Sequence, residues 1–230
     1  MHIPDDEDET AEPDQVLVWD LATRLFHWGL VILVAISVYT GLVGGFEEMD
    51  IHMLSGYGIL GLVTFRVAWG FVGPRHVRFS SFLRGPRAVI GHLRELPSRK
   101  ADDFVGHSPA GGLAIVALLL VLLIQAGTGL FSNDDIMLEG PLVHLIDYDT
   151  SRDLTRIHRN AYYVLLGLVG LHLAAIAFYT LYKRSRLIMP MITGYKRLVA
   201  NTVSVSHRLW LALPLAGAVG AGVYWLVNYL

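Results

Sequence analysis

Long apolar runs dominate the pattern of the chain, and five of them are long enough to cross a lipid bilayer. A spanning helix needs about 20 mostly apolar residues, because each residue rises about 1.5 Å across a hydrocarbon core of roughly 30 Å. The third run, GGLAIVALLLVLLIQAGTGLF, contains no charged residue. We therefore expect five membrane-spanning helices, at about 25–46, 51–73, 111–131, 159–182 and 209–230.

The polar segments between these runs complete the predicted organisation. Residues 74–110 include PRAVIGHLREL, an amphipathic pattern that begins at a proline and predicts a helix lying in the membrane interface. Residues 1–15 are acidic and proline-containing, which predicts a disordered cytoplasmic tail rather than a signal peptide. We expect an all-α integral membrane protein with a four-helix core over 16–182, then a basic linker and fifth helix over 183–230. We identify no internal repeat and no soluble catalytic domain.

Lysine and arginine mark one side of the predicted membrane domain. Residues 74–110 carry seven of them and residues 183–208 carry six, whereas residues 132–157 carry two. Because Lys and Arg accumulate in cytoplasmic loops, the N-terminus is predicted to be cytoplasmic and the C-terminus periplasmic. No nucleic-acid partner is expected, and membrane lipid surrounds the spans.

Composition narrows the possible chemistry. Hydrophobic residues make up 53% of the chain and charged residues 17%, against roughly 25% charged in soluble domains. The chain has no cysteine, which excludes disulfides, thiolate metal sites, iron–sulfur clusters, cysteine nucleophiles and thioether-attached c-type haem. A bound metal must therefore use histidine, methionine or oxygen ligands.

Four histidines fall within the predicted spans or, for His158, directly at the start of one, where a polar side chain is costly and usually functional. His158 and His172 are 14 residues apart on one helix, which leaves them about 40° apart around its axis and about 21 Å apart along it. The topology pairs His52 with His158 near the outer surface and His27 with His172 near the cytoplasmic one. Two histidine pairs between helices are typical of two bis-histidyl b haems.

Two arginines are candidates for binding haem propionates. Arg66 follows His52 by 14 residues and returns to the same helix face at the cytoplasmic level, and Arg24 is the second candidate. Simpler explanations are that single histidines near helix ends are interfacial residues and that Arg66 extends toward the cytoplasm. Glycines supply room for a porphyrin or serve helix packing, at positions 29, 41, 56, 58, 61, 167 and 170.

The chain resembles the bacterial cytochrome b561 and nickel–iron hydrogenase b-type cytochrome family, which is similar to formate dehydrogenase gamma subunits. The resemblance covers about residues 16–182. It rests on VWDLATRLFHW within 16–28, HMLSGYGILGLVTFRVAWGFVGPRHVRF at 52–79, GHSPAGG at 106–112 and RIHRNAYYVLLGLVGLHLAAI at 156–176. It implies a four-helix core whose two b haems are bound by residues that match His27, His52, His158 and His172.

The resemblance also implies partners. Family members exchange electrons with membrane quinone, with a quinone pocket near the cytoplasmic haem, and many anchor a larger redox enzyme in the bacterial inner membrane. We expect a periplasmic cytochrome c, or a dehydrogenase or hydrogenase subunit, to dock at the Asp-rich segment 132–157. The fifth span departs from the family pattern, and we expect it to pack against the core or a second protomer in a homodimer.

Two alternatives stay open. The first is a stand-alone superoxide:quinone oxidoreductase, in which Arg152, Arg156 and Arg159 guide an anion to His158; whether the chain is an enzyme by itself is open. The second is a membrane transporter whose histidines bind a metal ion. Two pairs about 21 Å apart lack the compact ligand cluster that zinc prefers.

Overall fold

The computed structural model describes residues 14–99, 104–136, 138–198 and 204–230. Five of its helices are long and apolar enough to cross a membrane, which confirms the all-α membrane fold expected from the hydropathy pattern. These helices are α1 (Leu21–Val43), α2 (Phe46–Val72), α5 (Pro109–Gly129), α6 (Tyr148–Leu181) and α8 (Leu209–Tyr229).

Side-chain caps set where three of the long helices begin. Asp20 and Ser108 accept hydrogen bonds from backbone amides in the first turns of α1 and α5. Asp147 caps α6 in the same way, 2.9 Å from the amide nitrogen of Thr150. The predicted start at residue 159 is therefore wrong by three turns. These turns are polar, so the apolar run did not include them, and His158 lies well inside the helix.

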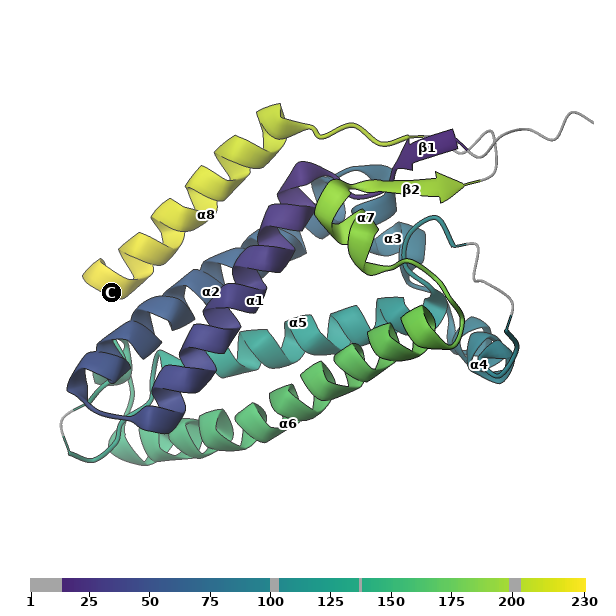
Figure 1. The fold of residues 1–230 in the computed structure, drawn as a ribbon. Coiled ribbons are helices and arrows are strands. Elements are labelled where there is room, and N and C mark those ends of the chain that lie inside the picture. The colour runs from purple at the N-terminus through teal and green to yellow at the C-terminus, as the bar shows by residue number, and fades with distance from the viewer. Residues whose placement is uncertain (1–13, 100–103, 137, 199–203) are drawn as a thin grey trace, which may run out of the picture.

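Short elements cluster at the end of the bundle where α1 begins, here called the sheet end (Figure 1). The helix predicted to begin at a proline is confirmed as α4 (Pro86–Glu95). The other short elements are β1 (Asp14–Leu17), η1 (Arg75–Val77), α3 (Phe79–Phe82), α7 (Ile188–Thr193) and β2 (Tyr195–Leu198) at this end, and η2 (Val143–Leu145) at the other.

Strands β1 and β2 form an antiparallel two-stranded sheet that joins distant parts of the chain. Val16, Leu17 and Leu198 are buried in it. The predicted disordered tail therefore extends two residues too far, because Asp14 and Gln15 belong to β1. Residues 1–13 of that predicted tail lie outside the described residues.

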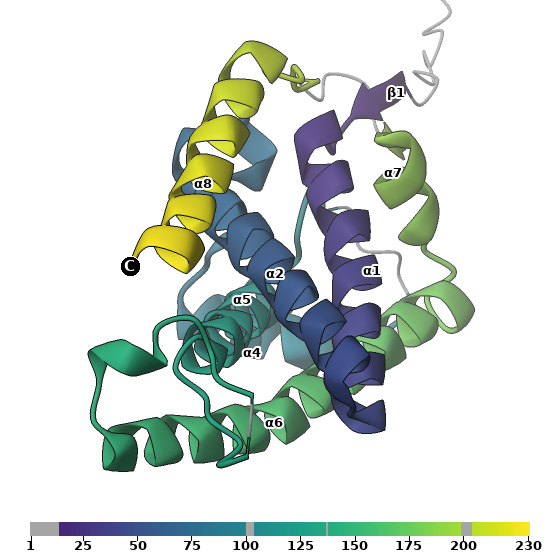
Figure 2. The same cartoon turned by 90° about the vertical axis from the view of Figure 1, so that its left-hand side faces the viewer.

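The spanning helices form two antiparallel pairs with α8 added at one side (Figures 1 and 2). Helices α1 and α2 meet at a tight turn, where Gly44 and Gly45 have φ angles of 69° and 103° that side chains disfavour. Helix α2 packs against α1, α5 and α8, and α5 packs against α6. We call the end that carries the Gly44–Gly45 turn the turn end.

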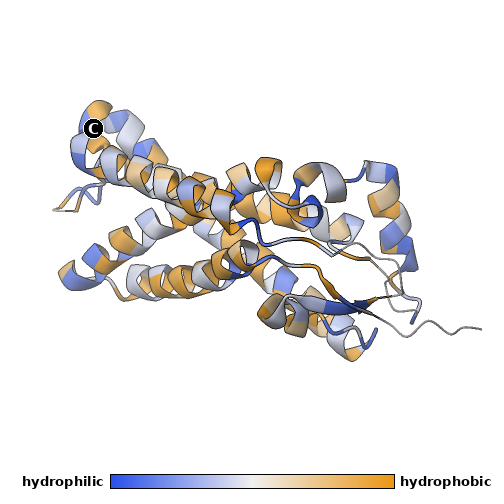
Figure 3. Ribbon diagram, turned by 90° about the horizontal axis from the view of Figure 1, so that it is seen from above, coloured by the Kyte–Doolittle hydropathy of each residue, from blue (hydrophilic) through white to orange (hydrophobic). Residues whose placement is uncertain are grey.

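Many large apolar side chains of the spanning helices are exposed on the outer surface and not buried between the helices. Leu54, Leu171 and Trp210 are each more than 60% exposed. Hydrophobic residues occupy the middle of the helices, and hydrophilic residues gather toward their ends (Figure 3). Such a surface is stable only in hydrocarbon, so the chain is a multi-pass membrane protein.

Candidate functional site

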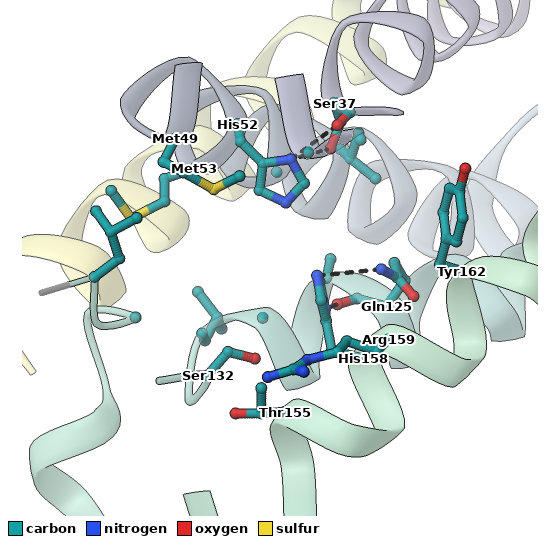
Figure 4. Close-up of a pocket in the computed structure, with 18 of the residues that line it drawn as sticks. Ser37, Met49, His52, Met53, Gln125, Ser132, Thr155, His158, Arg159 and Tyr162 are labelled. Atoms are coloured by element: carbon teal, nitrogen blue, oxygen red, sulfur yellow. Dashed lines mark hydrogen bonds between the residues drawn. The ribbon is translucent and has the colours of Figure 1, made fainter. Parts of the chain in front are cut away.

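Two histidines face each other near the turn end, one from each helix pair. His52 comes from α2 and His158 from α6, and their rings point toward one another (Figure 4). The ring centroids are 6.1 Å apart and the ring planes are 82° apart. The two residues line a cavity of about 590 Å³. The structure thus brings together one of the two pairs predicted from membrane depth.

Each of these rings is fixed by a hydrogen bond to a helix backbone. Nδ1 of His52 donates to the carbonyl oxygen of Ser37 on α1, at 2.8 Å. Nδ1 of His158 donates to the carbonyl oxygen of Gln125 on α5, also at 2.8 Å. A carbonyl oxygen can only accept, so the proton sits on Nδ1 and Nε2 keeps its lone pair. Both imidazoles are therefore in the tautomer that ligates a metal through Nε2.

This arrangement fits a bis-histidyl haem. Two metal–nitrogen bonds of about 2 Å, with about 1 Å more from each nitrogen to its ring centre, separate two ligand rings by about 6 Å. An imidazole whose other nitrogen donates to a backbone carbonyl is the usual form of a metal ligand. The amide nitrogen of Gln125 lies 3.2 Å from Nε2 of His158. A metal bound to Nε2 of His158 would displace this amide group.

Two glycines let the rings approach their anchoring helices. A Cβ atom at Gly41 would lie 3.0 Å from the ring of His52, and one at Gly129 would lie 3.0 Å from the ring of His158. Gly41 lies four residues after Ser37, and Gly129 lies four residues after Gln125. On each helix, the glycine makes room for an imidazole that bonds to the carbonyl one turn earlier.

The same short motif surrounds both anchors, ISVYTG at 36–41 and IQAGTG at 124–129. Its threonines, Thr40 and Thr128, are buried and donate to the carbonyls of Ile36 and Ile124. The expectation that the chain has no internal repeat missed this pair. The signal was the spacing Ile-x-x-x-Thr-Gly in two apolar runs of the same direction, which composition and hydropathy do not register.

The second predicted pair, His27 and His172, makes no ring contact among the described residues. His27 on α1 and His172 on α6 lie in the half of the bundle nearer the sheet end, within electrostatic range of each other. Nδ1 of His27 is buried and has no hydrogen-bond partner among the described residues. A buried polar atom without a partner is costly in a membrane, so this ring is available to a ligand.

The two candidate propionate arginines differ in their surroundings. Arg66 is 3% exposed; its Nη2 donates to the carbonyl of Val77 at 3.2 Å, and its Nη1 is buried without a described partner. Asp20, which is fully buried, lies within its electrostatic range. Arg24 donates through Nη1 to the carbonyl of Ile192 at 2.7 Å, which ties α1 to α7. Nε of Arg24 is likewise buried without a described partner, so both arginines keep a nitrogen that could bind an anion.

His107 lies beside Arg66, outside the spans. It packs between the rings of Trp19 and Phe82, with centroid distances of 4.5 and 4.7 Å. Burial disfavours its charged form, and the Arg66 cation adds repulsion, so the pKa of His107 falls from 6.5 to about 3.

The lowered pKa of His107 predicts acid sensitivity. The unfolded chain binds a proton near pH 6.5 that the folded chain refuses until about pH 3, so folding stability falls as the pH drops through this range. Between pH 7.5 and 5 the loss is about 2 kcal/mol. Thermal unfolding of the detergent-solubilised protein at both pH values checks this. We expect His107→Gln to lower the acid-induced loss of Tm; equal losses in both proteins contradict it.

The mouth of the histidine cavity is polar. Asp134, Glu139 and Arg159 line it. Of the three arginines expected to guide an anion, Arg156 pairs with Asp153 at 3.1 Å and Arg152 lies over the ring of Tyr148. Only Arg159 lines the cavity. Among the described residues no group of three or more His, Asp or Glu is placed to hold a metal ion.

Comparison with known proteins identifies the family. A family model described as prokaryotic cytochrome b561 matches residues 18–194, which is most of the chain. Neither a curated protein nor a solved structure matches.

Proposed function

The chain belongs to the prokaryotic cytochrome b561 family, and we propose that it is a dihaem member of it. Membership makes it a membrane b-type cytochrome that transfers electrons. We assign one haem to His52 and His158 and the other to His27 and His172. The main support is the facing geometry of His52 and His158, whose centroids are 6.1 Å apart.

The chain's own residues set the properties of both sites. Bound between paired imidazoles, a b-type haem supplies a reversible one-electron change at its iron. The carbonyls of Ser37 and Gln125 orient the rings of His52 and His158. The buried Arg66, with an unpartnered Nη1, would hold a negatively charged propionate of the second site. Helix α6 spaces the two sites by about 21 Å, because its two histidines are 14 residues apart.

We propose that the chain exchanges electrons between a periplasmic redox partner and membrane quinone. The turn end, with the acidic residues Asp134 and Glu139 at the cavity mouth, would face the periplasm and receive the partner. The basic segments of the sheet end would face the cytoplasm of a bacterial cell. The partner would be a cytochrome c or a dehydrogenase or hydrogenase subunit.

Haem counting, together with oxidation of the reduced protein by added quinone, tests this function. We expect a pyridine haemochrome assay of the purified protein to give two b haems per chain, and added quinone to oxidise the reduced protein. One haem per chain would contradict the four-histidine assignment. A two-haem protein that quinone leaves reduced would contradict the quinone link alone.

A further inference from the structure

The fifth spanning helix forms one wall of a second cavity. The lining of this cavity shares Tyr57 with the lining of the histidine pocket. Helix α8 lies beside α2 and α1 (Figure 2), and a groove of about 840 Å³ runs between the three helices. Its lining runs from Leu209 to Asn228 along α8, which is about 28 Å of helix. The groove is therefore long enough to take an extended apolar chain.

Small residues keep this groove open. Gly61 of α2 and Gly220 of α8 both line it. A Cβ atom at Gly61 would come no closer than 3.9 Å to Val223, and one at Gly220 would meet nothing within 4 Å. The space beside Gly220 is thus unfilled by protein.

Tyr57 connects the groove to the histidine pocket. It lines both cavities, and it follows His52 by five residues on α2, a rise of about 7.5 Å. Among the described residues its hydroxyl group makes no hydrogen bond, and it is not among the fully buried polar atoms. The hydroxyl is therefore free to donate to a ligand in either cavity.

The rest of the groove is almost entirely apolar, and its polar groups gather toward the turn end. Asn228 and Tyr224 lie there with Tyr57, while Leu25 and Leu209 line the opposite end. Of the residues that the structure describes, no Lys, Arg, Asp or Glu lines the groove. A phospholipid, with two acyl chains and a charged headgroup, matches this lining poorly.

We propose that this groove binds an isoprenoid quinone, with a head carbonyl hydrogen-bonded to Tyr57 and the tail along α8. The proposal rests on the quinone exchange proposed above and gives it a location beside His52 and His158, in addition to the cytoplasmic-side pocket that the family resemblance implies. Each quinol oxidised there loses two electrons, singly, to the adjacent b-type haem site and releases two protons to water. Quinone reduction has the reverse balance.

Two glycines of α8 provide a matched test. Gly220 lines the groove, whereas Gly217 does not, and a Cβ at either position meets nothing within 4 Å. Full-length Gly220→Leu and Gly217→Leu proteins are placed in nanodiscs that contain phosphatidylglycerol and ubiquinone-10. Quinone retained per chain is measured by extraction, and oxidation of the reduced protein is followed with decylubiquinone.

We expect Gly220→Leu to raise the KM for decylubiquinone at least tenfold and to lose retained ubiquinone-10, while Gly217→Leu matches the wild type in both. Tyr57→Phe, which keeps the ring, is expected to raise KM about fivefold by removing one hydrogen bond. Haem content is expected to stay equal in all four proteins. If Gly220→Leu and Tyr57→Phe behave as Gly217→Leu does, or if retained phospholipid replaces quinone, the groove proposal is wrong. A wild-type protein that does not react with quinone overturns the proposed quinone function as well.

Discussion

Replacing His158 with alanine is expected to remove one b haem per chain and leave the other bound. The carbonyl of Gln125 orients His158, whose ring faces that of His52. Without His158, the one remaining imidazole is not expected to retain a haem that needs two histidine ligands. The pyridine haemochrome value should fall by half. The spectrum of the remaining haem should be that of the His27 and His172 site.

The other histidines decide whether the pairing is right. His52→Ala should remove the same haem as His158→Ala, and His27→Ala should remove the other, which the two residual spectra will distinguish. His144→Ala is the control, because His144 is exposed and its hydrogen bond within the described part of the chain is to the carbonyl of Leu230. If His158→Ala and His27→Ala leave the same haem, the pairing by membrane depth is refuted.

Replacing Gly129 with leucine is expected to remove the same haem as His158→Ala, although all ligand histidines are kept. A Cβ at this position would already lie 3.0 Å from Cε1 of His158. A leucine there would push the ring away from the Gln125 carbonyl and out of line with His52. Gly41→Leu should act in the same way on His52, from α1.

Gly127 provides the control for this experiment. It lies on α5 two residues before Gly129, it does not line the cavity, and a Cβ there meets nothing within 4 Å. Gly127→Leu should therefore keep both haems, with a near-normal melting temperature. Two haems in Gly129→Leu would show that the close contact between backbone and ring is not needed.

The features that depend on periodicity could be predicted from the sequence. Apolar runs predicted the five spans, which the structure confirms. Helical spacing placed His52 at the level of His158, and the structure brings these two rings to 6.1 Å; the shared level of His27 and His172 stays a prediction. Such predictions are possible because both the bilayer thickness and the helix rise are fixed lengths. Helix α4 was predicted for a similar reason, since a proline at the first helical position is a local signal.

Features that depend on tertiary contact were missed. The Ser37 and Gln125 carbonyls are backbone atoms, which no residue-type pattern identifies. The first turns of α6 are polar, so hydropathy placed its start too late, although Asp147 is an ordinary cap residue. The connection between the groove and the histidine pocket at Tyr57 also required the packed position of α8.

The sheet between β1 and β2 has a consequence for biogenesis. Its first strand leaves the ribosome before α1, and its second strand follows α6. Both helix pairs are therefore synthesised before the strands can join, and α8 enters the membrane after them. During translation the bundle passes through a four-helix stage with β1 unpaired, which leaves an interval in which the sheet end is still open.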